Sequence, residues 1–201
     1  LSGTASAHDR ILYFQRLIEK TDNTIKPSII LRLNNAYWNT LLKHMKLFPG
    51  AVDILTYCKK NNIKTAIVSD LTTEVQLRKL EKLKISKYID VLVTSQEAGS
   101  EKAHSIMFLL SLNKLDVTPA EAIMVGDNSV ADIEGANYVG LTTVLFNKKR
   151  ISNVSEEDYK KPDHTIMSLK ELTKIIDEIK LEKVIEEGYI KFQCQIGRAH
   201  V

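Results

Sequence analysis

The chain has 201 residues, of which 44% are hydrophobic and 26% charged, the length and composition of one or two globular domains. This composition excludes disordered, collagen-like and coiled-coil classes. Lysine and arginine together number 28 and acidic residues 25, so the net charge of +3 is too small to indicate a nucleic-acid or membrane-surface partner. No apolar stretch approaches the roughly 18 residues that a membrane-spanning helix needs.

The cysteines and the two ends of the chain bear on its origin. Cys58 and Cys194 lie far apart and outside any metal-ligand spacing, so we expect a reducing, cytoplasmic setting and no zinc site. Residues 196–201 resemble no fold element and read like a translated sequencing-library adapter; the alternative is a natural polar tail. We expect the artefact and exclude these residues from fold reasoning. Because the chain begins at Leu1, we also expect a piece of a longer gene product, open at both ends.

Residues 1–48 are predicted to form a small helical domain. Apolar residues recur at helical spacing over residues 7–20, and again from Pro27 to about Leu47. Pro49 and Gly50 then end the helical pattern.

From residue 49 onward, short apolar runs rich in β-branched residues alternate with amphipathic helices. This alternation predicts a doubly wound parallel α/β sheet over residues 49–180, with helices on both faces. Residues 181–195 are predicted to be a C-terminal extension or the start of a further domain, and residues 189–192 alternate like a strand. The expected strands are 65–68, 89–93, 122–125, 141–146 and 164–167, and the expected helices are 73–83, 102–115, a short one through 136, and one opened by a capping box of Ser168 and Glu171.

Polar side chains follow three of the predicted strands. Ser69 and Asp70 come directly after the first strand, Lys102 lies in the segment after the second, and the run 126–132 follows the third. Because the carboxyl ends of parallel strands meet at one edge of a sheet, we expect these side chains to gather there. A hydroxyl, an ammonium and two carboxylates together suit a phosphate and a hard cation such as Mg²⁺.

In order and spacing, these motifs resemble the haloacid dehalogenase (HAD) superfamily. That family has a Ser or Thr at a strand end, matching Ser69, a Lys near a helix start, matching Lys102, and a Gly-Asp-x4-Asp motif, matching residues 126–132. The resemblance covers residues 49–180, and residues 7–48 lie where such enzymes carry a helical cap. It implies a HAD-like, Rossmann-type core and a Mg²⁺-dependent phosphatase that works through an aspartyl-phosphate intermediate.

The family's first motif, Asp-x-Asp-x-(Thr/Val), does not occur in these 201 residues. In the family it carries the nucleophile and the general acid/base on the first, central strand. We therefore expect it upstream of Leu1 and expect this fragment to be inactive. We also expect the fragment to be unstable, because a sheet without its middle strand exposes unpaired edges.

The resemblance also implies roles for individual residues around a small phosphorylated metabolite. Asp127 would hold Mg²⁺, and Asp132 would orient Lys102 or the water shell of the metal. Asp70 is equally compatible with capping the following helix. The catalytic residues implied are Ser69, Lys102, Asp127 and Asp132, and the substrate-binding residues are Ser69, Asp70, Lys102 and Asn128.

Other functions remain open at this point. Taken singly, a Ser at a strand end, a Lys near a helix start or a Gly-Asp-Asn run is an ordinary turn or surface feature. The main alternative is a non-catalytic HAD-like binding or regulatory domain, which the upstream sequence would distinguish. A receiver domain is disfavoured because receivers place their acidic residues first and their Lys last. Dehalogenases and phosphomutases share the fold, but the acidic pair favours metal-dependent phosphate chemistry.

Overall fold

The computed structural model describes residues 4, 6–147, 158–187 and 193–197. Its centre is a six-stranded parallel sheet in the order β2-β1-β6-β3-β4-β5, which confirms the predicted doubly wound α/β fold. The strands are β1 (Lys64–Ser69), β2 (Val91–Thr94), β3 (Ala122–Gly126), β4 (Thr142–Phe146), β5 (His164–Ile166) and β6 (Gln193–Gly197). The helices around them are α3 (Ala51–Lys60), α4 (Thr73–Leu83), α5 (Ser95–Ala98), α6 (Ser105–Leu115), α7 (Gly135–Val139) and α8 (Leu172–Glu187).

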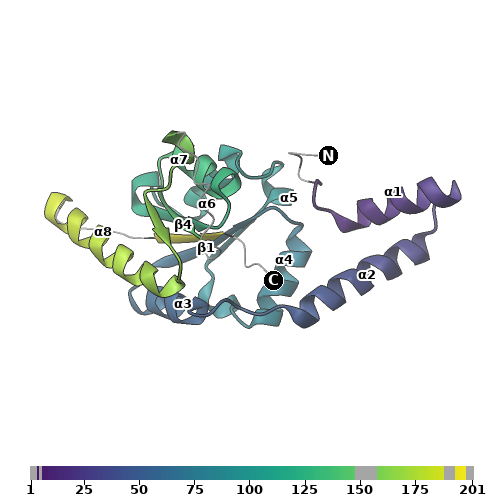
Figure 1. Cartoon of the computed structure of the whole chain (residues 1–201), viewed down its shortest axis with the longest axis horizontal. Coiled ribbons are helices and arrows are strands. Elements are labelled where there is room, and N and C mark those ends of the chain that lie inside the picture. Colours follow the sequence, from purple (N-terminus) through teal and green to yellow (C-terminus); the bar gives the residue numbers. More distant parts are fainter. Residues whose placement is uncertain (1–3, 5, 148–157, 188–192, 198–201) are drawn as a thin grey trace.

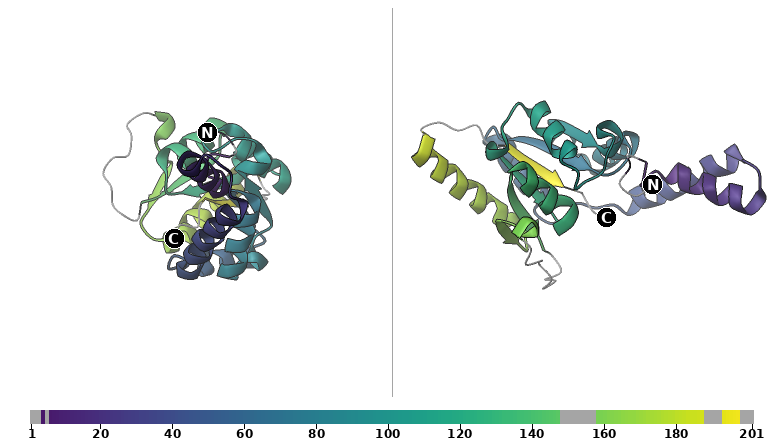
Figure 2. Two further views of the ribbon diagram at one scale, coloured as in Figure 1. Left: turned by 90° about the vertical axis from the view of Figure 1, so that its right-hand side faces the viewer. Right: turned by 90° about the horizontal axis from the view of Figure 1, so that it is seen from above.

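Helices cover both faces of the sheet (Figures 1 and 2), and the side chains of β3 show how the sequence produces this arrangement. Ile123 and Val125 belong to an apolar cluster with residues of α3 and α8. Ala122 and Met124 belong to a second cluster with residues of α6 and α7 on the other face. Successive side chains of a strand point to opposite faces, so a strand covered on both faces has a continuous apolar run.

Two further helices, α1 (Arg10–Asp22) and α2 (Pro27–His44), form a hairpin that extends away from the sheet (Figure 1). Asp9 begins α1 by accepting a hydrogen bond from the Ile11 N–H at 2.9 Å, and α2 begins at a proline, as is common at a first helical position. Near the core, Arg78 of α4 donates a hydrogen bond to Asn39 of α2 at 2.7 Å. The hairpin lies in the region predicted to be a cap domain, and that assignment stays a prediction.

The middle of the sheet differs from the expectation. The chain's own strand β6 lies between β1 and β3 and pairs in parallel with both, so the position expected to be empty is filled. Ile196 and Gly197, expected outside any fold element, are the last residues of this strand. A central strand satisfies the backbone donors and acceptors of both neighbours, so the physical reason for the expected instability does not hold in this structure. The adapter origin of residues 196–201 stays a prediction.

Local signals explain the remaining differences. The sequence patterns did not predict α3, and α6 begins at Ser105 rather than at Lys102 because His104 caps it, accepting a hydrogen bond from the Ile106 N–H at 3.2 Å. The capping box of Ser168 and Glu171 is present, in the single turn η5 (Leu169–Glu171) that leads into α8. The strand-like run 189–192 lies outside the described residues.

Among the helices of the described ranges, none is both long and apolar enough to cross a membrane.

Candidate active site

The carboxyl-terminal edge of the sheet brings the predicted site residues together. Ser69 is the last residue of β1, Lys102 lies between α5 and α6, and Asp132 lies in the π-helical turn η3 (Ser129–Glu134) that follows β3. These three side chains are buried, whereas Asp127 and Asn128 are exposed where β3 ends. The site therefore has a buried polar floor and an exposed acidic rim.

A buried ion pair forms the floor of the site. The Lys102 ammonium lies 2.5 Å from Asp132 Oδ1 and donates a second hydrogen bond to the Val68 carbonyl oxygen at 3.1 Å. The Lys102 side chain is 0% exposed and that of Asp132 1%. A charge is tolerated at this depth only when it is paired and hydrogen-bonded, and both conditions are met. The pair therefore fixes an ammonium group directly beneath the end of β1.

Asp132 uses both carboxylate oxygens inside the protein. Its Oδ1 accepts from Lys102, and its Oδ2 accepts from the Asn128 backbone N–H at 3.1 Å. A Cβ atom added at Gly126 would overlap the Asp132 side chain, so the glycine of the motif makes room for this carboxylate. Of the two roles considered for Asp132, the geometry favours orienting Lys102.

Asp70 and Asn128 shape the loops around the site. Asp70 is buried, and its Oδ1 accepts a hydrogen bond from the Lys102 backbone N–H at 2.8 Å. Thr72 occupies the N-cap position of α4, without a side-chain cap hydrogen bond, so the prediction that Asp70 is the N-cap residue is wrong. Asn128 Oδ1 accepts from the Val130 and Ala131 N–H groups at 3.0 and 2.9 Å and so begins η3. Contact of Asp70 or Asn128 with a substrate stays a prediction.

Two side chains outside the predicted set of site residues contact this region. The Gln76 amide nitrogen donates a hydrogen bond to Ser69 Oγ, and Gln76 is buried on α4. A glutamine on the apolar side of a predicted amphipathic helix is the signal that could have indicated it. His8 contacts the carboxylate of Glu101, the residue before Lys102, and so ties the start of the helical hairpin to the Lys102 segment.

The acidic residues can supply part of a Mg²⁺ site. Among the described residues, no group of three or more His, Cys, Asp or Glu side chains could hold a metal ion. Asp132 accepts hydrogen bonds from Lys102 and Asn128, and Asp127 is the exposed carboxylate at the end of β3. Mg²⁺ in proteins is typically held by one or two carboxylates with waters and substrate phosphate oxygens. Asp127 fits one position of such a site, and the other ligands would come from outside the described residues.

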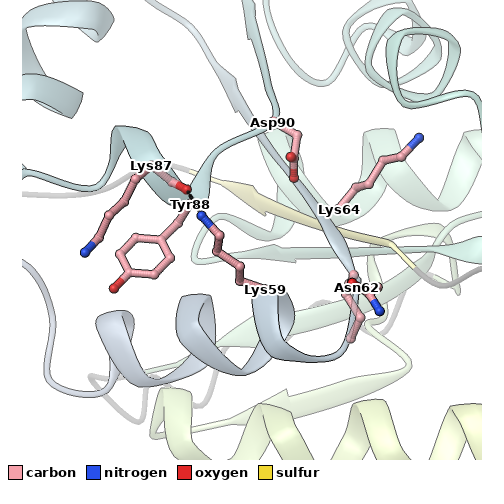
Figure 3. Close-up of a pocket in the computed structure, with 7 residues that line it drawn as sticks. Lys59, Asn62, Lys64, Lys87, Tyr88 and Asp90 are labelled. Carbon is pink, nitrogen blue, oxygen red and sulfur yellow. Dashed lines mark hydrogen bonds between the residues drawn. The ribbon is translucent and has the colours of Figure 1, made fainter.

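A cavity of about 320 Å³ lies at the opposite, amino-terminal edge of the sheet, beside Lys64 and Asp90 (Figure 3). The ammonium ends of Lys64 and Lys87 point away from each other. Lys64 instead donates to the Leu115 carbonyl oxygen at 2.8 Å. Because its cations do not converge on one point, this cavity does not compete with the carboxyl-terminal edge as a phosphate site. Its lining residues are Lys59, Asn62, Ile63, Lys64, Lys87, Tyr88 and Asp90.

Known proteins resemble the chain in sequence and in fold. It is 42% identical over 179 residues to the ribulose-1,5-bisphosphate 5-phosphatase of Halopiger xanaduensis, covering 87% of this chain and 75% of that protein. It is 30% identical over 165 residues to the glyceraldehyde 3-phosphate phosphatase of Pyrococcus furiosus, covering 82% of this chain and 69% of that one. The solved HAD-hydrolase YfnB of Bacillus subtilis shares the fold, with a TM-score of 0.65 at 19% identity over 84% of this chain and 70% of that chain.

These likenesses confirm the resemblance drawn from the motifs and agree with a phosphoric monoester hydrolase, since the named sequence relatives are phosphatases. The family model described as haloacid dehalogenase-like hydrolase matches residues 8–146, a range that includes Ser69, Lys102 and Asp132. The chain therefore belongs to the haloacid dehalogenase-like hydrolase family.

Proposed function

We propose that this chain is the phosphate-binding and metal-binding part of a Mg²⁺-dependent phosphatase that acts on a small phosphorylated metabolite in a reducing cytoplasm. The observation that carries the proposal is the buried Lys102–Asp132 pair beside Ser69. Asp132 accepts hydrogen bonds from Lys102 and from the Asn128 backbone N–H, so the proposed phosphate contacts are the Lys102 ammonium and the Ser69 hydroxyl. Both groups are buried in this structure, so a ligand would reach them only after the surrounding chain moves. Fixed donors of this kind stabilise the charge of a transferring phosphoryl group.

Each residue has a distinct task in the proposed reaction. The Ser69 hydroxyl donates a hydrogen bond to one phosphoryl oxygen, and the Lys102 ammonium offsets the charge of another. Asp127 would hold Mg²⁺, which when bound neutralises charge on the phosphoryl oxygens. Asp132 keeps Lys102 pointing at the ligand, and Asn128 shapes the loop that presents Asp127.

The nucleophile is proposed to lie on a strand in an upstream segment of the full-length protein. The 201 residues contain no Asp-x-Asp motif, and the central strand offers no substitute. In β6, the residue level with Val68 is Gly197, which has no side chain to attack phosphorus. In the full-length protein, an upstream aspartate at this position would attack phosphorus and displace the alcohol of the ester. Water would then hydrolyse the acyl phosphate to inorganic phosphate and restore the carboxylate.

The proposed substrate class is a short-chain sugar phosphate. The sequence relatives named above act on ribulose 1,5-bisphosphate and on glyceraldehyde 3-phosphate. The higher identity to the first makes ribulose 1,5-bisphosphate the first compound to test. Both are phosphate monoesters of small polyhydroxylated carbonyl compounds, so one phosphoryl site with different leaving-group contacts would serve either.

The test is phosphate release by the full-length protein with Mg²⁺, over a panel of both compounds and related sugar phosphates. We expect release from at least one of them, and we expect Asp127→Ala to abolish it by removing a metal ligand. Unchanged turnover in Asp127→Ala would refute the metal assignment. Asp116→Asn is a suitable control, because it removes a carboxylate at the C-cap of α6, away from the site residues, and asparagine is tolerated in the left-handed conformation there.

A non-catalytic binding or regulatory domain is the second candidate, and the missing Asp-x-Asp motif is the observation that favours it. The two functions differ in whether the full-length protein releases phosphate from the esters that it binds. If its upstream segment lacks the leading aspartate, it should bind phosphate esters without releasing phosphate. In that case the binding function replaces the enzymatic one.

A further inference from the structure

We infer that Gln76 is a positioning residue that makes the Ser69 hydroxyl a hydrogen-bond donor toward the ligand. This inference rests on the proposed phosphate-binding function of the site. Its structural basis is the contact of the Gln76 amide nitrogen with Ser69 Oγ, seven residues apart in sequence and both buried.

Gln76 is held in place by the first turn of α4. The Thr73 backbone N–H donates to Gln96 Oε1 at 2.9 Å, and the Thr73 hydroxyl lies 2.8 Å from that of Thr94, so this turn is tied to the end of β2. Gln76 is only 7% exposed and lies between the buried residues Val75 and Leu80 in sequence. Burying an amide is costly unless it is hydrogen-bonded, and here one bond goes to a residue of the candidate site.

The direction of that bond determines what Ser69 can offer. A hydroxyl has one proton to donate and two lone pairs that accept. Since the Gln76 N–H donates to Ser69 Oγ, it occupies a lone pair and leaves the hydroxyl proton for another acceptor. A phosphoryl oxygen at neutral pH mainly accepts hydrogen bonds. Gln76 therefore sets Ser69 in the state that a phosphate group requires.

The same strand end is held from a second side. The Lys102 ammonium donates to the carbonyl oxygen of Val68, the residue directly before Ser69. Gln76 holds the side chain of Ser69 and Lys102 holds the backbone next to it. These contacts fix Ser69 beside the Lys102 ammonium. In the proposed function, both groups bind the same tetrahedral phosphate.

The test measures binding of inorganic phosphate to the full-length protein with Mg²⁺ by calorimetry. Gln76→Glu places a hydrogen-bond acceptor where the donor was, so the Ser69 proton turns toward residue 76. We expect roughly ten- to hundredfold weaker binding at pH 8, the loss of one hydrogen bond to a charged group. Gln76→Met, which neither donates nor accepts strongly, should lie between this variant and the native protein. Gln15→Glu is the matched control, because Gln15 lies on α1, where it is half-buried and donates a hydrogen bond to Glu19.

The pH dependence separates positioning from a merely structural role. As the pH falls, the carboxyl at residue 76 of Gln76→Glu takes up a proton and can donate to Ser69 again. The affinity of this variant, expressed as a ratio to the native protein at each pH, should therefore recover at low pH. A ratio that stays constant with pH would overturn the inference, as would equal affinities in all Gln76 variants.

A second measurement uses only the native protein and does not depend on whether a variant folds. Addition of inorganic phosphate should shift the NMR resonances of the Gln76 side-chain amide, because its bond to Ser69 tightens when the hydroxyl donates. Phosphate binding without such a shift would overturn the role of Gln76 alone. A native full-length protein that binds no phosphate would overturn the proposed function and this inference with it.

Discussion

The buried ion pair makes a strong prediction about stability. Asp132→Asn keeps the shape of the side chain but removes the negative charge that faces Lys102. The Lys102 side chain is 0% exposed, so water cannot replace the lost partner. Breaking one side of a buried pair costs about 3–5 kcal/mol, a large share of the roughly 5–15 kcal/mol that stabilises a typical protein.

Thermal unfolding followed by circular dichroism measures this cost. For a protein of this size, each kcal/mol corresponds to about 2–4 °C in Tm, so Asp132→Asn should unfold roughly 6–20 °C below the native chain. Glu97→Gln is the matched control. Lys114 lies 2.5 Å from Glu97, the same separation as the buried pair, but the two side chains are 31% and 40% exposed. Exposed pairs contribute about 0–1 kcal/mol, so this control should shift Tm by only a few degrees.

A double variant separates the charge from its surroundings. Lys102→Met with Asp132→Leu removes both charges, and replacing a buried pair by apolar side chains is often neutral or stabilising. The double variant should therefore be more stable than Asp132→Asn alone. The reasoning is refuted if Asp132→Asn and Glu97→Gln have the same small effect, or if the double variant is the least stable of the set.

Two further predictions concern packing and pH. Gly126→Ala should destabilise the chain by about 1–3 kcal/mol in chemical denaturation, because its Cβ would overlap the Asp132 side chain; an unchanged midpoint would contradict the close packing there. Burial and the hydrogen bond to Asp177 raise the pKa of Tyr57 above its ordinary 10.0, so the unfolded chain loses the phenol proton first and stability is lost as the pH rises above that value. Between pH 9 and 11 the Tm of the native chain should therefore fall more steeply than that of Tyr57→Phe, and parallel curves would refute this.

The sheet could be predicted from the sequence because its strands are buried on both faces. The apolar run of β3 identifies it as a strand without knowledge of which strands it pairs with. The turn residues after this run mark where the strand ends. The helix α3 was missed because its pattern follows directly on the Pro49-Gly50 turn and was not distinguished from it. The pairing of β6 with β1 and β3 joins segments more than 65 residues apart, as in Ala122 with Gln193, and no local pattern encodes such a partner choice.

The candidate site was predictable in its members but not in their contacts. The order of Ser69, Lys102 and the acidic pair is visible in the sequence and identified the family. Sequence spacing does not determine side-chain rotamers or the paths of loops. It therefore could not show which oxygen of Asp132 contacts Lys102, or that Asp70 accepts from a backbone N–H rather than capping a helix. Gln76 was missed for the same reason, since it lies in the first turn of α4 while its partner Ser69 is the last residue of β1.

The position between β1 and β3 links the fold to the proposed activity, because only one strand can occupy it. In this structure β6 pairs there with both neighbours and ends level with Val68 at the carboxyl-terminal edge. The proposed nucleophile must reach the same edge, beside Ser69 and Lys102. An upstream strand that carries it would therefore have to displace residues 193–197.

Hydrogen exchange can detect this displacement through the backbone amides alone. In the 201-residue chain, the amides of residues 193–197 should exchange slowly, because a central strand opens only with much of the sheet. In the full-length protein the same amides should exchange rapidly, while those of β1 and β3 stay protected by the new strand. A full-length protein that releases phosphate and still protects residues 193–197 would show that the nucleophile reaches Lys102 from outside this sheet position. The upstream strand would then have to join the sheet elsewhere, and the expectation of a first, central strand carrying the nucleophile would be wrong.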